Sequence, residues 1–159
     1  MSSDSTVKFL WSDAWLVHAA GMAATSGDSD LATVIATGDA IQHAIFTRSE
    51  LNGAIGRLQR AGLLAYDGGA LRLTPNGSEL FSNATAVGRT IRRHADALEV
   101  ALGAEPCHPK YRPHEAAGNE VEVVSSEEYE RALRAYYRTS RRSRPRRPKH
   151  HTKRPNEEL

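Results

Sequence analysis

A capped helix followed directly by a hairpin, between residues 47 and 74, constrains the fold of this chain more than any other feature. Thr47 and Glu50 have the spacing of a capping box, in which each side chain accepts a hydrogen bond from the other residue's backbone N–H. Apolar residues then recur with helical spacing as far as Ala61. Gly62 ends this helix, because glycine readily adopts the positive φ of a C-terminal cap.

Two short apolar runs after this helix predict a β-hairpin. Leu63–Tyr66 and Ala70–Thr74 have strand length and are separated by Asp67-Gly68-Gly69. Asp-Gly and Gly-Gly pairs favour tight hairpin turns, because they tolerate the positive φ that such turns need. Pro75-Asn76-Gly77 then ends the hairpin and begins another helix.

Two further helices are predicted before residue 47. Residues 11–24 are mostly apolar and predict a buried first helix, in which His18 is expected to be a core residue with satisfied hydrogen bonds. Residues 31–45 predict a second helix that is broken at Gly38. The break is expected because glycine inside a helix costs about 1 kcal/mol relative to alanine.

Residues 77–103 predict one long helix. Its apolar residues recur at alternating steps of four and three, which is typical of a packing seam. The seam is predicted either to form a homodimer interface or to pack on the first helix through Trp11 and Trp15. The residues of the predicted dimer interface are Leu80, Val87, Ile91, Leu98 and Leu102.

The C-terminal part is predicted to be an appendage followed by a tail. Residues 104–138 contain a proline-rich linker, a short strand at Val121–Val124 and a helix that opens with a capping box at Ser125–Glu128. Residues 139–159 are almost devoid of apolar side chains, so they cannot bury enough surface to offset their ordering entropy. This tail is predicted to be disordered.

Charge is divided unevenly between the tail and the rest of the chain. Residues 138–159 contain nine Lys or Arg and two Glu, a net of +7, whereas residues 1–137 carry a net charge of −5. Arginine-rich segments bind polyanions with little sequence preference, although such a tail can also be merely solubilising. The residues expected to give non-specific nucleic-acid affinity are Arg138, Arg141, Arg142, Arg144, Arg146, Arg147, Lys149, Lys153 and Arg154.

The stretch Thr47–Leu80, TRSELNGAIGRLQRAGLLAYDGGALRLTPNGSEL, resembles the core of a winged-helix domain of the MarR and PadR kind. The resemblance covers about residues 9–85 and implies a winged-helix domain over residues 1–85. It also implies that Thr47–Ala61 is the DNA recognition helix and Leu63–Thr74 the wing. The expected fold class is therefore mainly α: a winged helix-turn-helix with a two-stranded wing, a long following helix and a disordered basic C-terminal tail.

Helical geometry then suggests which side chains of the recognition helix face DNA. With Leu51 at the centre of the buried face, a step of about 100° per residue places Asn52 and Arg57 on the flanks of the outer face. Asn and Arg read bases by paired hydrogen bonds in the major groove. The two glycines on the outer face either admit DNA closely or lie beneath another helix of this chain. The candidate DNA-binding residues are Arg48, Ser49, Asn52, Gly53, Gly56, Arg57, Arg60 and Arg72.

Several classes of protein are excluded or unsupported by the sequence. The single cysteine, Cys107, cannot form an internal disulfide. The pairs Cys107-His108 and His150-His151, with His114, lack the spacing of a zinc site, so no metal or cofactor is expected. No nucleophile, base and oxyanion donors can be assembled, so we expect no enzyme. No apolar run reaches about 18 residues, so no membrane span is expected, and the expected location is the cytoplasm.

The function expected from these features is non-enzymatic DNA binding, as a transcriptional regulator. Residues 1–85 contain five basic and eight acidic side chains. Because phosphate neutralisation provides most of the affinity for nucleic acids, the tail would have to supply much of it. Two alternatives remain open: a winged helix that binds a partner protein in a larger assembly, and an RNA- or ribosome-associated protein.

Overall fold

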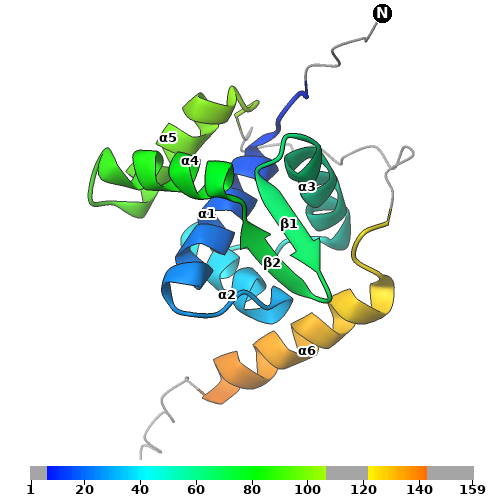
Figure 1. The fold of residues 1–159 in the computed structure, drawn as a ribbon. Helices are drawn as coiled ribbons and strands as arrows, with labels where there is room; N and C mark the ends of the chain where they lie inside the picture. The colour runs from blue at the N-terminus through cyan, green and yellow to red at the C-terminus, as the bar shows by residue number, and fades with distance from the viewer. Residues whose placement is uncertain (1–6, 107–121, 143–159) are drawn as a thin grey trace, which may run out of the picture.

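The computed structural model describes residues 7–106 and 122–142 and confirms a mainly α chain with one β-hairpin after the third helix (Figure 1). The elements, in chain order, are α1 (Trp11–Thr25), α2 (Leu31–Gln42), α3 (Arg48–Arg60), β1 (Leu64–Asp67), β2 (Ala70–Leu73), α4 (Pro75–Ala86), α5 (Ile91–Leu102) and α6 (Ser126–Arg142). None of these helices is long and apolar enough to cross a membrane.

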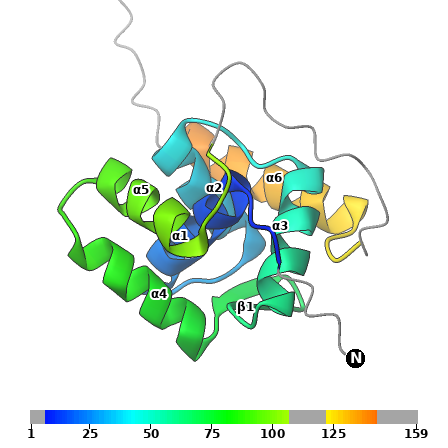
Figure 2. The same ribbon diagram turned by 90° about the horizontal axis from the view of Figure 1, so that it is seen from above.

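Helix α1 lies at the centre of the molecule, with α2, α3, α4, α5 and β2 packed around it, while α6 packs on α2 (Figures 1 and 2). Every residue from 11 to 20 is buried. The Trp15 ring stacks on Trp11 with ring centroids 5.3 Å apart and on Phe46 with centroids 3.5 Å apart. The predicted buried first helix is therefore confirmed, and its apolar character on all sides reflects its central position.

Helix α2 is continuous through Gly38, so the predicted break is wrong. The Trp15 Nε1–H donates a hydrogen bond to the Gly38 carbonyl at 3.0 Å, and a Cβ at Gly38 would clash with the Phe46 ring. Glycine is needed here because the two aromatic rings approach the helix backbone closely. This packing outweighs the low helix propensity of glycine.

The hairpin has the predicted turn. The antiparallel register pairs Leu64 with Leu73 and Asp67 with Ala70, and the turn residues Gly68 and Gly69 have φ values of 55° and 86°. A further β-bridge joins Ala70 to Asp30, at the start of α2. The hairpin is thereby tied to the helices at its turn end.

The single long helix predicted over residues 77–103 is wrong. The chain reverses between α4 and α5, which pack against each other (Figure 2). Thr90 caps α5, and a ring nitrogen of His94 lies 2.7 Å from the Gly88 carbonyl oxygen, which stabilises the reversal. The reversal also divides the predicted dimer seam: Leu98 is fully buried, whereas Val87 and Ile91 are 64% and 44% exposed. Helix α5 packs on α1, as the alternative prediction has it, and the homodimer stays a prediction.

Helix α6 begins at the predicted capping box, in which Ser125 and Glu128 satisfy each other's backbone N–H groups. It runs to Arg142, so the first four residues of the predicted disordered tail, 139–142, are helical. Residues 122–124 form no strand, which corrects the predicted strand at Val121–Val124. The rest of the tail and the candidate metal ligands Cys107, His108, His114, His150 and His151 lie outside the described residues.

Candidate functional site

Helix α3 has the local structure expected of the predicted recognition helix. The Thr47 hydroxyl accepts from the Glu50 N–H at 3.1 Å, and the Glu50 carboxylate accepts from the Thr47 N–H at 2.8 Å, so the capping box is confirmed. Leu51, Ile55 and Leu58 are fully buried on its inner face. The helix is therefore firmly attached to the core.

The side chain of Asn52 is occupied by the chain's own backbone. Its amide oxygen accepts hydrogen bonds from the N–H groups of Val123 and Val124 at 2.9 and 2.7 Å, and its amide nitrogen donates to the Val124 carbonyl at 3.2 Å. Asn52 is only 8% exposed. The expectation that it lies on an open flank is wrong, because the segment before α6 covers that flank.

The opposite flank of α3 is occupied by a buried ion pair. Arg57 donates to the Asp13 carboxylate from Nε at 2.8 Å and from Nη2 at 2.9 Å. Asp13 also accepts from the Leu10 N–H at 2.9 Å and is fully buried. The guanidinium of Arg57 therefore joins α3 to the first turn of α1, and the expectation of an outward Arg57 is wrong.

The remaining candidates on α3 form a narrow outer strip. Ser49 and Arg60 are exposed as expected and Gly56 is half-buried. Gly53 is buried, so of the two alternatives given for the glycines, open access for DNA does not hold at Gly53. Arg48 is half-buried and forms an ion pair with Glu122, beside the segment that covers Asn52.

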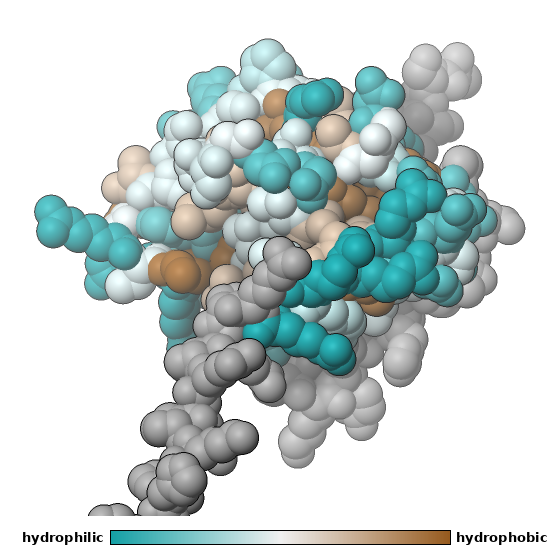
Figure 3. All heavy atoms as spheres, turned by 90° about the horizontal axis from the view of Figure 1, so that it is seen from below, coloured by the Kyte–Doolittle hydropathy of each residue, from teal (hydrophilic) through white to brown (hydrophobic). Residues whose placement is uncertain are grey.

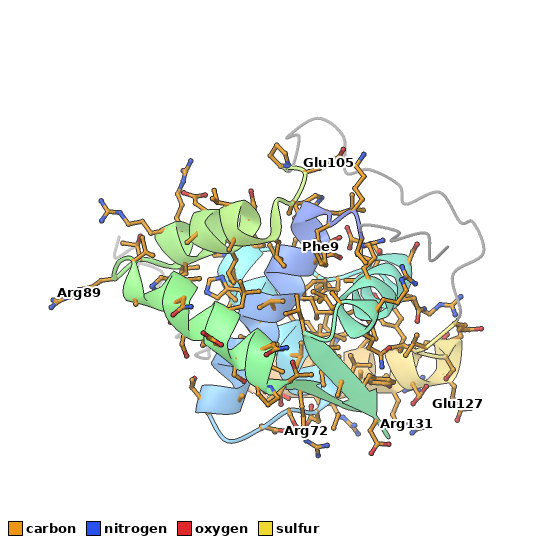
Figure 4. All side chains as sticks on the ribbon, turned by 45° about the horizontal axis from the view of Figure 1, so that its top comes forward. Phe9, Arg72, Arg89, Glu105, Glu127 and Arg131 are labelled. Atoms are coloured by element: carbon orange, nitrogen blue, oxygen red, sulfur yellow. The ribbon has the colours of Figure 1, made fainter. Side chains whose placement is uncertain are left out.

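Arg72 is exposed on β2, at the lower edge of the molecule in Figure 4. Of the predicted DNA-binding side chains of α3, Ser49 and Arg60 are therefore the exposed ones.

Tyrosine hydroxyls attach α6 to the preceding elements. Tyr129 donates to the Phe46 carbonyl at 2.7 Å, and Tyr136 donates to the Asp39 carboxylate, also at 2.7 Å. Tyr66 of β1 donates to Glu128 at 3.2 Å, and burial together with this carboxylate raises the pKa of Tyr66 to about 12. These contacts hold α6 against α2 and the hairpin.

The outer face of α6 carries a row of arginines. Arg131, Arg134, Arg138 and Arg141 are exposed and are spaced by three, four and three residues, so they lie on one side of the helix. We call them the arginine row. Figure 3, which views the molecule from below, shows hydrophilic side chains gathered on this face.

Among the described residues, the first two members of the arginine row form ion pairs. Arg131 pairs with Glu127 at 3.1 Å and Arg134 with Glu130 at 3.6 Å. No ion pair of Arg138 or Arg141 is found within residues 7–106 and 122–142. Their positive charge at the helix C-terminus is favoured by the helix dipole.

Sequence reasoning missed Arg131 and Arg134 as parts of a basic surface. The signal was present, because the same helix places Tyr129, Leu133 and Tyr136 inward, and the arginines fall between these positions. The predicted basic segment begins at Arg138 and so does not include them. The helical spacing of the apolar residues therefore predicts that Arg131 and Arg134 extend the basic surface of the tail.

His18 is buried in the core but its hydrogen bonds are not satisfied. Among the described residues, neither ring nitrogen has a partner, and its ring centroid lies 5.7 Å from that of His94 on α5. Burial, and secondarily the charge of His94, lower the pKa of His18 to about 4. The imidazole is therefore neutral at physiological pH.

Open cavities flank the core. One, of about 560 Å³, lies between α1, β2 and α4, and another, of about 470 Å³, lies between α2 and α5. A smaller one, of about 230 Å³, lies between the start of α2, the hairpin turn and α6. Within the part of the chain that the structure describes, no three His, Cys, Asp or Glu side chains are grouped to hold a metal ion. No protein-family model, curated protein or solved structure matches this chain.

Proposed function

We propose that this chain is a non-enzymatic DNA-binding protein with a winged-helix fold, in which α6 and the basic tail contact the phosphates. The order of three helices and a hairpin supports this fold, and so does the bridge that ties Asp30 to the hairpin at Ala70. The observation that carries the proposal is the exposed arginine row on α6. It leads directly into a segment with six further basic residues between residues 143 and 159.

The electrostatics favour this surface over the outer strip of α3. Affinity for duplex DNA depends mainly on neutralising phosphates with Lys and Arg. Helix α3 offers Arg60 as an exposed cation, since Arg57 is paired with Asp13 and Arg48 with Glu122. A flexible or helical row of arginines meets backbone phosphates rather than base edges, so we expect weak sequence preference.

Fluorescence anisotropy of a labelled DNA duplex tests the proposal with the full chain over a range of salt concentrations. Replacing Arg138 and Arg141 with Gln removes two cations and should flatten the slope of log K against log salt by about 2. The matched control replaces Arg89, in the connection between α4 and α5, and Arg92, in the first turn of α5. Figure 4 shows Arg89 on the side of the molecule opposite Glu127 and Arg131 of α6. Equal effects of the two double variants, or no duplex binding by the unmodified chain, would refute the proposal.

A second candidate function is a protein-interaction module on the same fold. The specific observation in its favour is that Asn52 and Arg57, the best base-reading side chains of α3, are buried in contacts within the chain. A protein of this class should bind DNA only weakly and should co-purify with a stoichiometric partner. A labelled RNA hairpin in the anisotropy experiment separately tests an RNA-associated role.

A further inference from the structure

Strand β2 has an edge that is paired at one end and open at the other. The Leu71 N–H donates to the Ser29 carbonyl at 2.7 Å, and the Leu31 N–H donates to the Gly69 carbonyl at 3.0 Å. These two bonds form the bridge between Asp30 and Ala70. Pairing stops there, because no residue before Ser29 bridges to β2.

The backbone of Leu73 faces this open edge. In an antiparallel strand the N–H and C=O groups of alternate residues point to the same side. Leu71 donates to Ser29 and therefore faces away from β1, so Leu73 does too, whereas the next N–H, of Thr74, donates to Leu63 at 3.1 Å. The outer edge at Leu73 has no hydrogen-bond partner within the described ranges.

A groove of about 560 Å³ runs along this open edge. Phe81 provides apolar surface within it, and Ser78 and Ser82 of α4 provide hydroxyl groups. Arg72 lines it as well and has no ion pair among the residues that are described. The remaining lining residues come from the end of α1 and the α1–α2 turn: Gly21, Ala24, Thr25, Gly27, Asp28 and Ser29.

The charged groups of the groove differ in their availability. The Asp28 carboxylate accepts hydrogen bonds from the Asp30 N–H at 3.0 Å and the Thr33 hydroxyl at 3.0 Å, and these bonds lower its pKa. The Asp28 carboxylate is thus engaged in hydrogen bonds within the chain. Arg72 is exposed, and Figure 4 shows it near the connection between α1 and α2. The free charge offered to an occupant is therefore positive.

We propose that this groove binds an extended peptide of a partner protein, which adds a strand to the open edge of β2. The peptide backbone would pair with the N–H and C=O of Leu73. An apolar side chain would pack over Phe81, and an acidic residue would lie beside Arg72. A peptide suits this edge because it offers alternating donors and acceptors with strand spacing.

The proposal does not depend on DNA binding. The groove is lined by α1, β2 and α4, whereas the arginine row lies on α6. Loss of peptide binding and loss of DNA binding are therefore expected from different substitutions. A chain that failed the DNA experiment could still bind the peptide.

Selection from a displayed library of random heptapeptides against the full chain tests the proposal. We expect enriched peptides with one apolar position and one acidic position, and we would measure their affinity by isothermal titration calorimetry. Leu73→Pro removes the outward N–H while keeping an extended backbone, and should weaken binding about five- to tenfold, as expected for one lost hydrogen bond. Leu73→Ala is the matched control, because it shortens the side chain but keeps the N–H.

Two further variants do not alter the strand backbone. Ser82→Trp, at an exposed position of α4, should fill the groove and abolish binding. Arg72→Glu should reverse the preference for an acidic residue in the library. The proposal is overturned if no peptide is enriched, or if enriched peptides bind the Pro and Trp variants as tightly as the unmodified chain. Circular dichroism of each variant shows whether it is folded.

Discussion

Arg57 and Asp13 form a two-point ion pair that joins the last turn of α3 to the first turn of α1. Nε and Nη2 of the arginine lie 2.8 and 2.9 Å from the two carboxylate oxygens, and Asp13 is completely buried. If one residue of such a buried ion pair is replaced, the charge of the other residue stays unpaired in the protein interior. The pair therefore belongs to the framework of the fold.

The first prediction concerns this pair. Arg57→Ala should lower the free energy of unfolding by about 3–5 kcal/mol, because it leaves the Asp13 carboxylate buried without its cation. Chemical denaturation measures the effect, with Arg60→Ala on the exposed side of the same helix as the control. If Arg57 instead contacts DNA, its replacement would weaken DNA binding and leave the stability close to that of the unmodified chain.

The second prediction concerns the cover on the other flank of α3. Asn52→Ala removes the acceptor of two backbone N–H groups, those of Val123 and Val124, and each unpaired group costs about 1–3 kcal/mol if it stays buried. We therefore expect the segment before α6 to detach locally. Faster amide hydrogen exchange at Val123 and Val124 would show this, and Ser49→Ala should leave both rates unchanged. Unaltered exchange in the Asn52 variant would contradict the assigned contact.

The local elements of this fold could be predicted, and their long-range contacts could not. The capping boxes at Thr47 and Ser125 and the glycine turn of the hairpin depend on residues a few positions apart. The partners of Asn52 and Arg57 lie 71–72 and 44 residues away, so helical periodicity could place these side chains on flanks but could not say what covers the flanks. The same limit explains why two of the proposed DNA-reading side chains are buried.

Two errors in the helices have the same origin. The predicted break at Gly38 depended on propensity alone, and stacking of Phe46 against Trp15 outweighs it. The predicted long helix depended on an apolar repeat that continues across the α4–α5 reversal. The first half of that repeat lies on α4 and the second half on α5. The same spacing of apolar residues therefore occurs in one long helix and in two helices that pack on each other.

The third prediction follows from Gly38. Gly→Ala inside a helix normally stabilises it by about 1 kcal/mol. Here the added methyl group would meet the Phe46 ring, so Gly38→Ala should destabilise the protein by about 1–3 kcal/mol through overpacking. Thermal unfolding measures the change, with Ala40→Gly at an exposed position of α2 as a propensity control. A higher melting temperature for Gly38→Ala would show that the core yields at this position.

The fourth prediction concerns pH and the buried His18. Burial lowers the pKa of His18 to about 4, below the ordinary value of 6.5, so the unfolded chain takes up a proton first as the pH falls. Stability from this group is therefore complete above pH 6.5 and is lost progressively towards pH 4, by at most about 3 kcal/mol. The charged form would face His94 on α5 and the Phe81 ring on α4.

Denaturation of the His18→Leu variant between pH 7 and pH 4 measures this contribution as a difference from the unmodified chain. The variant should lose less stability over this range, because carboxylate titrations are common to both proteins. His43→Asn, which replaces an exposed histidine, is measured beside it as the control substitution. Parallel stability curves for the unmodified chain and the His18 variant would show that His18 does not titrate in this range.

The fifth prediction separates the tail from the folded part of the chain. Because α6 continues to Arg142, the informative change begins after it, and it replaces six basic residues with Gln in the full-length chain. The residues replaced are Arg144, Arg146, Arg147, Lys149, Lys153 and Arg154.

If about half of these six residues engage phosphates, the slope of log K against log salt on duplex DNA should flatten by about 3. Any sequence preference should survive the replacement, because the Arg and Lys side chains of the tail are expected to contact DNA phosphates and not base edges. An unchanged slope would assign the affinity to the arginine row alone, and a lost sequence preference would mean that the tail itself reads bases or groove shape.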